Sequence, residues 1–236
     1  MNIKKNKNIL FKILLGKAPK KIHAYYIFSI LMFYFIITVI SICLYPEPYS
    51  LFNHISNLGS KSANPNGYLL WNIGTVILGL LFIPHMIYIH NYFISLSPRL
   101  NILNYSLGII SSIGWSLVGV FREDFITAHF ITASIAFIGL LITLDLDFVI
   151  ICNRKSEFAN KVHFRVILIH YILLNIIFLI SIILPNLDYF FPDISLNSPW
   201  LTYPPWEWFY FTILLLLILN LFLFIPKNTE KAITID

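Results

Sequence analysis

Long uninterrupted apolar stretches, each of about twenty residues, constrain this chain more than any other feature of its sequence. A helix of about 20 residues crosses a hydrocarbon core of roughly 30 Å, and in lipid only helices and closed barrels satisfy their own backbone groups. Because the apolar residues do not alternate with polar ones, the stretches predict helices. We therefore expect an all-α integral membrane bundle of six transmembrane helices, at about 24–44, 69–91, 102–121, 125–151, 166–185 and 206–226.

The overall composition excludes a water-soluble fold. Hydrophobic residues make up 58% of the chain and charged residues 11%, whereas a soluble domain has about 25% charged residues. The two cysteines, Cys43 and Cys152, are expected near opposite faces of the membrane. A disulfide between them is therefore not predicted.

The basic residues predict the orientation of the bundle. Of the 16 Lys and Arg residues, all but Lys61 and Arg122 fall in segments on one side of the expected spans. By the positive-inside rule that side is cytoplasmic. The predicted organisation is a basic cytoplasmic segment at 1–23, a transmembrane domain at 24–226 and a cytoplasmic tail at 227–236, in the cell membrane. The lysines of 1–23 would set this topology or lie on anionic lipid headgroups, and no nucleic-acid partner is needed to explain the net charge of +5.

The stretch "FREDFITAHF", residues 121–130, places polar residues between two predicted spans on the outer side. Asp124 stands where the N-cap of the fourth span is expected, so its carboxylate would accept from free backbone N–H groups. His129 lies about five residues into that helix, roughly 7 Å below its start. A polar side chain at that depth should face the bundle interior or a cavity. Arg122 and Glu123 complete the stretch.

Two further outer segments carry polar residues. Glu207 in "PPWEWFYF" falls in the first turn of the last span, where the helix dipole favours a negative charge, or it points inward toward His129. "HISNLGS", residues 54–60, predicts a short helix or re-entrant segment that brings His54, Ser56 and Asn57 to the same cavity. An ordered loop is the alternative. A second long outer loop is expected at 186–205.

These motifs together resemble a known family. "HISNLGS…NPNGYLLWNIG", then "GVFRED…AH", then "WEW" is similar to the six-span membrane proteins called domain of unknown function 998, over roughly residues 24–226. The chain departs from the family pattern at Asn57, where Asp is usual, and at Arg122, where Pro is usual. A more distant likeness is to Frag/DRAM/Sfk-type membrane proteins, some tied to lipid remodelling. The resemblance implies the architecture and the matching positions Ser56, Asn57, Gly59, Asp124, His129 and Glu207, but no settled activity.

The outer polar residues suggest an enzyme that acts on membrane lipid, as a hydrolase or by acyl transfer. The predicted catalytic residues are His54, Asp124, His129 and Glu207. They would serve as general acid and base, or as ligands of Zn²⁺ with an open position for water. The predicted binding residues are Ser56, Asn57, Arg122 and Glu123.

Two other functions stay open at this point. In a non-catalytic scaffold, Asp124 with Arg122 and Glu207 with His129 would be structural pairs. A small-solute transporter would need polar residues through the membrane midplane, and the predicted spans have few there. The other membrane histidines, His85, His90, His163 and His170, are expected at the inner interface as structural residues, and Asp145 and Asp147 are expected to reach the inner surface or to pair with Arg154.

Overall fold

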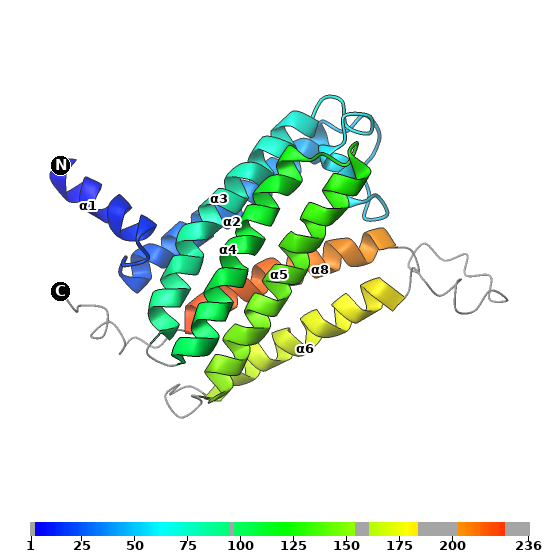
Figure 1. Ribbon diagram of the computed structural model, residues 1–236. Coiled ribbons are helices and arrows are strands. Elements are labelled where there is room, and N and C mark those ends of the chain that lie inside the picture. The colour runs from blue at the N-terminus through cyan, green and yellow to red at the C-terminus, as the bar shows by residue number, and fades with distance from the viewer. Residues whose placement is uncertain (1–2, 95–96, 154–160, 184–202, 225–236) are drawn as a thin grey trace.

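The computed structural model describes residues 3–94, 97–153, 161–183 and 203–224. Within these ranges the chain forms helices and no strand (Figure 1), which confirms the all-α class. The predicted outer loop at 186–205 falls almost wholly outside the described residues, and the predicted tail at 227–236 does so entirely. The helices are α1 (Ile3–Leu14), α2 (Lys20–Cys43), the 3-10 helix η1 (Ile55–Gly59), α3 (Tyr68–Phe93), α4 (Pro98–Val120), α5 (Ile126–Asn153), α6 (Lys161–Ile183) and α8 (Tyr203–Phe224).

Each predicted span coincides with one helix, with ends shifted by a few residues. Four helices, α2 to α5, are long and apolar enough to cross a membrane. The apolar stretches described within α6 and α8 are shorter, as in Glu207–Leu216. The chain therefore has the architecture of a multi-pass membrane protein. In the described part of the chain, Cys43 and Cys152 are not joined by a disulfide.

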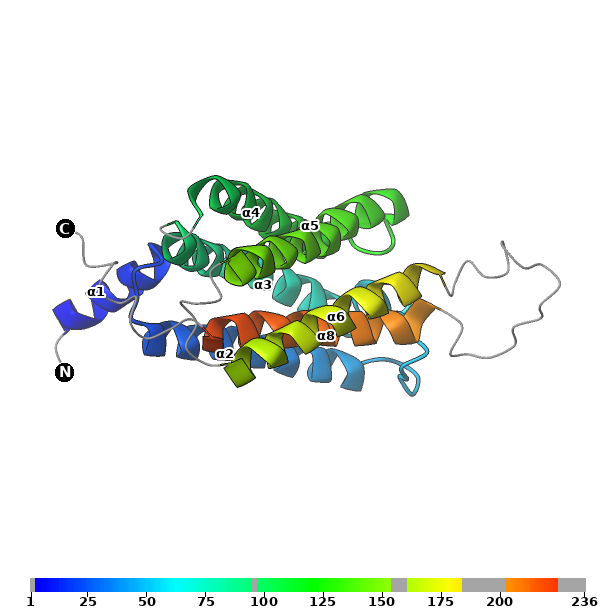
Figure 2. The same cartoon turned by 90° about the horizontal axis from the view of Figure 1, so that it is seen from below.

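The helices pack as neighbouring pairs. α4 lies along both α3 and α5, α6 lies along α8, and α2 lies beside α3 and also touches α8. Figure 2 shows α4 and α5 on one side of α3, with α2, α8 and α6 on the other side. Segments distant in sequence, such as the ends of α2 and α8, therefore meet inside one bundle.

Small residues allow α3 and α4 to approach closely. A Cβ added at Gly79 of α3 would meet the backbone nitrogen of Ser116 and lie 2.6 Å from the carbonyl oxygen of Ser112, both on α4. Ser116 also donates a hydrogen bond across the interface to the carbonyl of Val76 at 3.2 Å. In a bilayer, where apolar side chains gain little by leaving lipid, such close backbone packing is a main source of helix association.

We expect Gly79→Ala to lower the free energy of unfolding by about 1–3 kcal/mol, because the new methyl group must push α4 away. The higher helix propensity of Ala acts in the opposite direction, by about 0.8–1 kcal/mol. A measured loss of stability would therefore come from the interface between α3 and α4. Thermal unfolding in mild detergent measures the effect. The matched control is Gly139→Ala in α5, whose Cβ would lie 3.1 Å from the side chain of Ser111 and meets no backbone atom closer than 3.6 Å. Equal effects of the two substitutions would contradict this account.

Candidate functional site

The segment after α2 folds back over one end of the bundle, and Asn64 holds it there. The side-chain nitrogen of Asn64 donates to the carbonyl oxygens of Leu58 (3.1 Å) and Ser41 (3.3 Å), and its oxygen accepts from Gly67 N. Asn72 of α3 donates to the carbonyl of Gly59 at 2.9 Å. The last two carbonyl groups of η1 are therefore hydrogen-bonded to side chains, which hold η1 on the bundle. The predicted short helix within 54–60 is thereby confirmed.

Glu207 ties the start of η1 to α8. One carboxylate oxygen accepts hydrogen bonds from His54 Nδ1 and from the backbone N–H of Ile55, both at 3.2 Å. One residue further along α8, Trp208 donates from Nε1 to the carbonyl of Asn53 at 3.0 Å. The hydrogen bond to Glu207 raises the pKa of His54 above its ordinary 6.5, against the opposing effect of partial burial. The ion pair that Glu207 forms within the described residues is therefore with His54, while Glu207 and His129, the pair expected from the sequence, both line the cavity described below.

Glu123 lies beside the same segment. With the Asn57 amide oriented so that its nitrogen faces the carboxylate, Nδ2 lies 2.9 and 3.0 Å from the two oxygens of Glu123. The Ser56 hydroxyl also donates to this carboxylate. Burial raises the pKa of Glu123 above its ordinary 4.5, while nearby His129 and His54 act to lower it.

Asp124 stabilises a loop rather than a helix, so its predicted role as the N-cap of α5 is wrong. Its carboxylate accepts from the backbone N–H groups of Lys61 (2.9 Å) and Ser62 (3.4 Å) and from the hydroxyls of Ser60 and Ser62 (both 3.1 Å). Helix α5 begins only at Ile126. The carboxylate of Asp124 therefore accepts hydrogen bonds from the loop at residues 60–62 and not from the first turn of α5.

Arg122 fastens Asp124 from the other side. Its Nε lies 3.6 Å from a carboxylate oxygen of Asp124. Its guanidinium carbon lies over the rings of Tyr68 and Phe125, at 5.3 and 5.4 Å from their centroids. Arg122 and Asp124 thus form the structural pair expected for a scaffold, at the loop end of the cluster.

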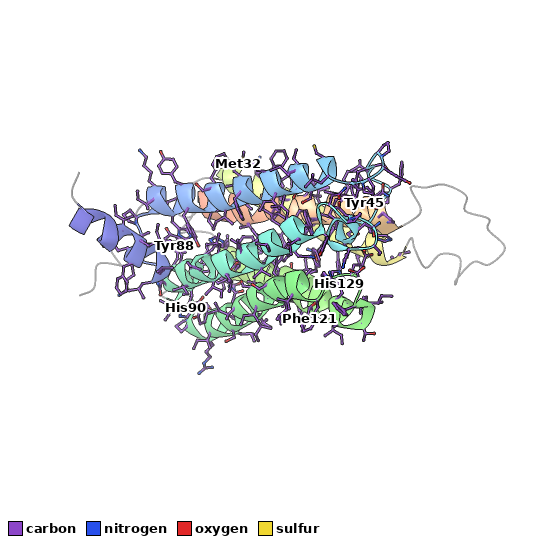
Figure 3. All side chains as sticks on the ribbon, turned by 90° about the horizontal axis from the view of Figure 1, so that it is seen from above. Met32, Tyr45, Tyr88, His90, Phe121 and His129 are labelled. Atoms are coloured by element: carbon purple, nitrogen blue, oxygen red, sulfur yellow. The ribbon has the colours of Figure 1, made fainter. Side chains whose placement is uncertain are left out.

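His129 is the fourth residue of α5, roughly 4.5 Å below its start. Its Nδ1 lies 2.8 Å from the carbonyl oxygen of Phe121. A carbonyl can only accept, so Nδ1 carries the proton and Nε2 keeps its lone pair in the neutral ring. Figure 3 shows His129 and Phe121 at the same end of the bundle as Tyr45, with Tyr88 and His90 at the other end.

His129, Ser56 and Glu207 line a cavity beneath η1. The space within it that water-sized molecules can occupy is about 50 Å³. The remaining lining residues come from η1, α2, α3, α4, α5 and α8 and are mainly apolar and aromatic: Tyr34, Ile55, Gly59, Trp71, Asn72, Thr75, Trp115, Val118, Ala133, Phe137 and Phe211. A mainly apolar and aromatic lining with few polar groups is typical of small-molecule sites.

Trp115 also lines this cavity, and the sequence analysis did not select it. Its side chain is 3% exposed and packs against the rings of Phe82, Phe137 and Phe211. Among the described residues, its indole Nε1–H has no hydrogen-bond partner. A buried donor without an acceptor costs about 1–3 kcal/mol, and an acceptor atom of a ligand would satisfy it.

The predicted zinc ligands do not form a metal site. Across the part of the chain that the structure describes, which includes His54, Asp124, His129 and Glu207, no group of three or more His, Cys, Asp or Glu side chains is placed to hold a metal ion. The physical reason is that the carboxylate of Asp124 is committed to the loop at Lys61–Ser62 and that of Glu207 to His54 and Ile55. The prediction of Zn²⁺ on these four residues is therefore not supported by their geometry.

The polar residues at the other end of the bundle have partners among the described helices. Asp147 is buried and accepts from the side-chain nitrogen of Asn104 at 2.5 Å, and Asn175 lies 3.4 Å from Asp145. The predicted partner Arg154 lies outside the described residues, as does the side chain of His163. His85 is buried and within 3.1 Å of His23, a histidine that the sequence analysis passed over.

Comparison of the chain with protein-family models, with curated proteins and with solved structures gives no match in any of the three. The likeness to the domain of unknown function 998 proteins stays a prediction from the motifs quoted above.

We expect Asp124→Asn to lower the free energy of unfolding at neutral pH by about 1 kcal/mol, because a charged acceptor of two N–H and two O–H groups is lost. Partial burial acts to raise the pKa of Asp124, but the hydrogen bonds from Lys61 N, Ser60 and Ser62 outweigh it and hold the pKa below 3.8. This stabilisation is therefore complete above pH 3.8 and is lost as the pH falls through the folded-state pKa.

Thermal unfolding of Asp124→Asn and of the parent chain from pH 3 to pH 8 measures this contribution. Glu47→Gln, at an exposed position of the same segment, is the matched control. A difference between Asp124→Asn and the parent that grew as the pH fell would contradict the assignment.

Proposed function

We propose that this chain is an enzyme of the outer leaflet that cleaves or transfers an acyl group of a membrane lipid. The observation that carries the proposal is that one aromatic cavity is lined by His129, oriented through Nδ1, and by Trp115, whose buried N–H has no partner among the described residues. An acyl group presents a carbonyl oxygen to a donor and a carbonyl carbon to a nucleophile, so these two groups suit its chemistry.

His129 is the proposed general base. The Phe121 carbonyl fixes the ring and its tautomer, so Nε2 is the nitrogen available to take a proton. The nucleophile is water or the hydroxyl of Ser56, which lines the same cavity. As the nucleophile attacks the carbonyl carbon, its proton moves to His129, which then protonates the departing alcohol or amine.

Trp115 is the proposed donor to the acyl oxygen. Charge develops on that oxygen when the carbonyl carbon becomes tetrahedral, and a fixed donor in a site without water stabilises it. The three rings packed around the indole hold its position. Trp115 lies five residues before the end of α4 and His129 near the start of α5, so the two side chains enter the cavity at similar depths.

The shape of the cavity favours a lipid substrate. His129 and Glu207 stand near the starts of α5 and α8, and the aromatic lining residues Phe137 and Phe211 of the same helices lie further in. Phe137 follows His129 by eight residues, roughly 12 Å deeper along α5, and Phe211 lies roughly 6 Å deeper than Glu207 along α8. A molecule with a polar head at the mouth and an acyl chain below it matches this gradient.

The membrane arrangement belongs to the same proposal. We propose that α6 and α8 also span, which gives six spans with both termini cytoplasmic and the cavity facing the outer side of the cell membrane. The distribution of the basic residues supports this orientation. Membership of the domain of unknown function 998 group would follow from the matching motif positions, of which Ser56, His129 and Glu207 line the cavity.

We expect His129→Asn to reduce acyl release by about 10²–10⁴-fold, the usual contribution of a positioned base. The Asn side-chain nitrogen can replace Nδ1 as donor to Phe121, so the local structure is kept while the base is lost. The measurement is mass spectrometry of lipids after incubation with the protein in nanodiscs that contain ester-linked and amide-linked lipids. Trp115→Phe keeps the ring but loses the N–H, and we expect a reduction of about 10²-fold or more.

The matched control is His170→Asn, because His170 on α6 lies 2.9 Å from the carbonyl of Val166 through the same ring nitrogen but outside the cavity. Its acyl release should equal that of the parent. Ser56→Ala separates the two nucleophiles, since only a serine nucleophile would be lost. Unchanged turnover in His129→Asn, or no turnover of any lipid by the parent chain, would refute the enzyme.

A non-catalytic scaffold is the second candidate, and the bonds of Glu207 favour it. Glu207, Trp208 and Asp124 join the outer loop to α8 and to the α4–α5 turn. In that case His129→Asn and Trp115→Phe would alter melting temperature alone. The lipid assay and thermal unfolding of the same variants therefore distinguish the two candidates.

A further inference from the structure

Helix α1 lies outside the bundle. The sequence analysis expected only a basic segment at 1–23, but residues 3–14 form a helix of 12 residues. Figure 1 shows α1 running across the axis of the bundle at the end opposite η1. This direction is unlike that of α2 to α5, which follow the bundle axis.

The junction between α1 and α2 is fixed to α3. Gly16 has a φ of +63°, and a Cβ on it would lie 2.6 Å from the backbone nitrogen of Tyr88. The side chain of Asn91 donates to the carbonyl oxygens of Leu15 (2.9 Å) and Gly16 (3.2 Å). Only glycine combines this backbone conformation with so close an approach. The direction of α1 is therefore set by the fold.

The second half of α1 has two different faces. Leu10 and Leu14, one turn apart, are 61% and 49% exposed, and neighbouring Phe11 is 61% exposed. Lys12, two residues from each leucine, is on the other side of the helix and exposed. Lys4, Lys5 and Lys7 precede it in the helix sequence, and α1 contains no acidic residue.

We propose that α1 lies in the surface of the membrane, with its apolar face among the acyl chains and its lysines on anionic phospholipid headgroups. Amphipathic helices with an apolar face and a Lys-rich polar face bind in this way. Positive charge without a single carboxylate matches an anionic headgroup layer. Only residues 15–19 separate α1 from α2, so a membrane crossed by α2 brings this surface within reach. This inference does not depend on the proposed enzyme.

The test uses the full chain in nanodiscs, with Cys43 and Cys152 changed to Ser. An environment-sensitive fluorophore is attached in one variant at L10C and in a matched variant at K12C. We expect the L10C probe to be shielded from acrylamide, a neutral water-soluble quencher, and the K12C probe to be quenched. The shielding should be greater in discs that contain phosphatidylglycerol than in discs of phosphatidylcholine alone.

Charge is tested by Lys4→Gln together with Lys5→Gln in the L10C variant. Each lysine near an anionic surface is worth about fivefold in binding, so the ratio of shielded to exposed probe should fall by about 25-fold in phosphatidylglycerol discs. In phosphatidylcholine discs it should not change. Equal quenching at L10C and K12C in anionic discs would overturn the proposal. A second outcome would also overturn it: shielding at both positions that does not depend on lipid charge and that disappears with one chain per disc. That result would show that a second copy of the chain, and not lipid, covers α1.

Discussion

Hydrocarbon offers no hydrogen bonds to a polypeptide, and this constraint governs the arrangement of the whole molecule. It requires helices of membrane length and leaves little tolerance for polar side chains along them. Polar residues therefore collect where helices end and water begins. The outer cluster, made of His54, Ser56, Asn57, Glu123, His129 and Glu207, lies where η1 covers the ends of the surrounding helices.

Within that end of the bundle, most of the polar atoms have structural partners. Asp124 binds the turn at Lys61–Ser62, and Glu207 binds the start of η1. Asn64 and Asn72 satisfy the backbone of the same segment. Two polar groups at this end are not used by these bonds: one nitrogen of His129 and the indole N–H of Trp115. Both residues line the cavity of aromatic rings. Groups that folding has positioned but that have no structural partner are the candidates for a chemical site.

The same reasoning changes the kind of chemistry that the cluster can support. Four residues that could each ligate zinc were expected together, but two of their carboxylates hold the outer loop in place. Acid–base catalysis needs one correctly oriented histidine, a donor and a nucleophile. In the proposed enzyme, His129, Trp115 and Ser56 would supply these roles from three different elements. The energetic cost of holding an unsatisfied indole N–H in a buried site would be repaid when a ligand binds.

The sequence by itself determined the all-helical class, the approximate ends of the helices and the end at which polar residues gather. These properties are local, because twenty apolar residues specify a helix in lipid whatever they pack against. It also indicated a short helix or re-entrant segment after α2, because "HISNLGS" is too polar to span a membrane and too apolar for a plain linker. Only the tertiary structure decided the partners. Glu207 meets His54, which is 153 residues away, because α8 packs beside α2, and no local pattern encodes that adjacency. Trp115 joined the site, and Gly16 fixed α1 across the bundle, for the same reason: contacts between distant segments depend on how the helices are arranged in three dimensions.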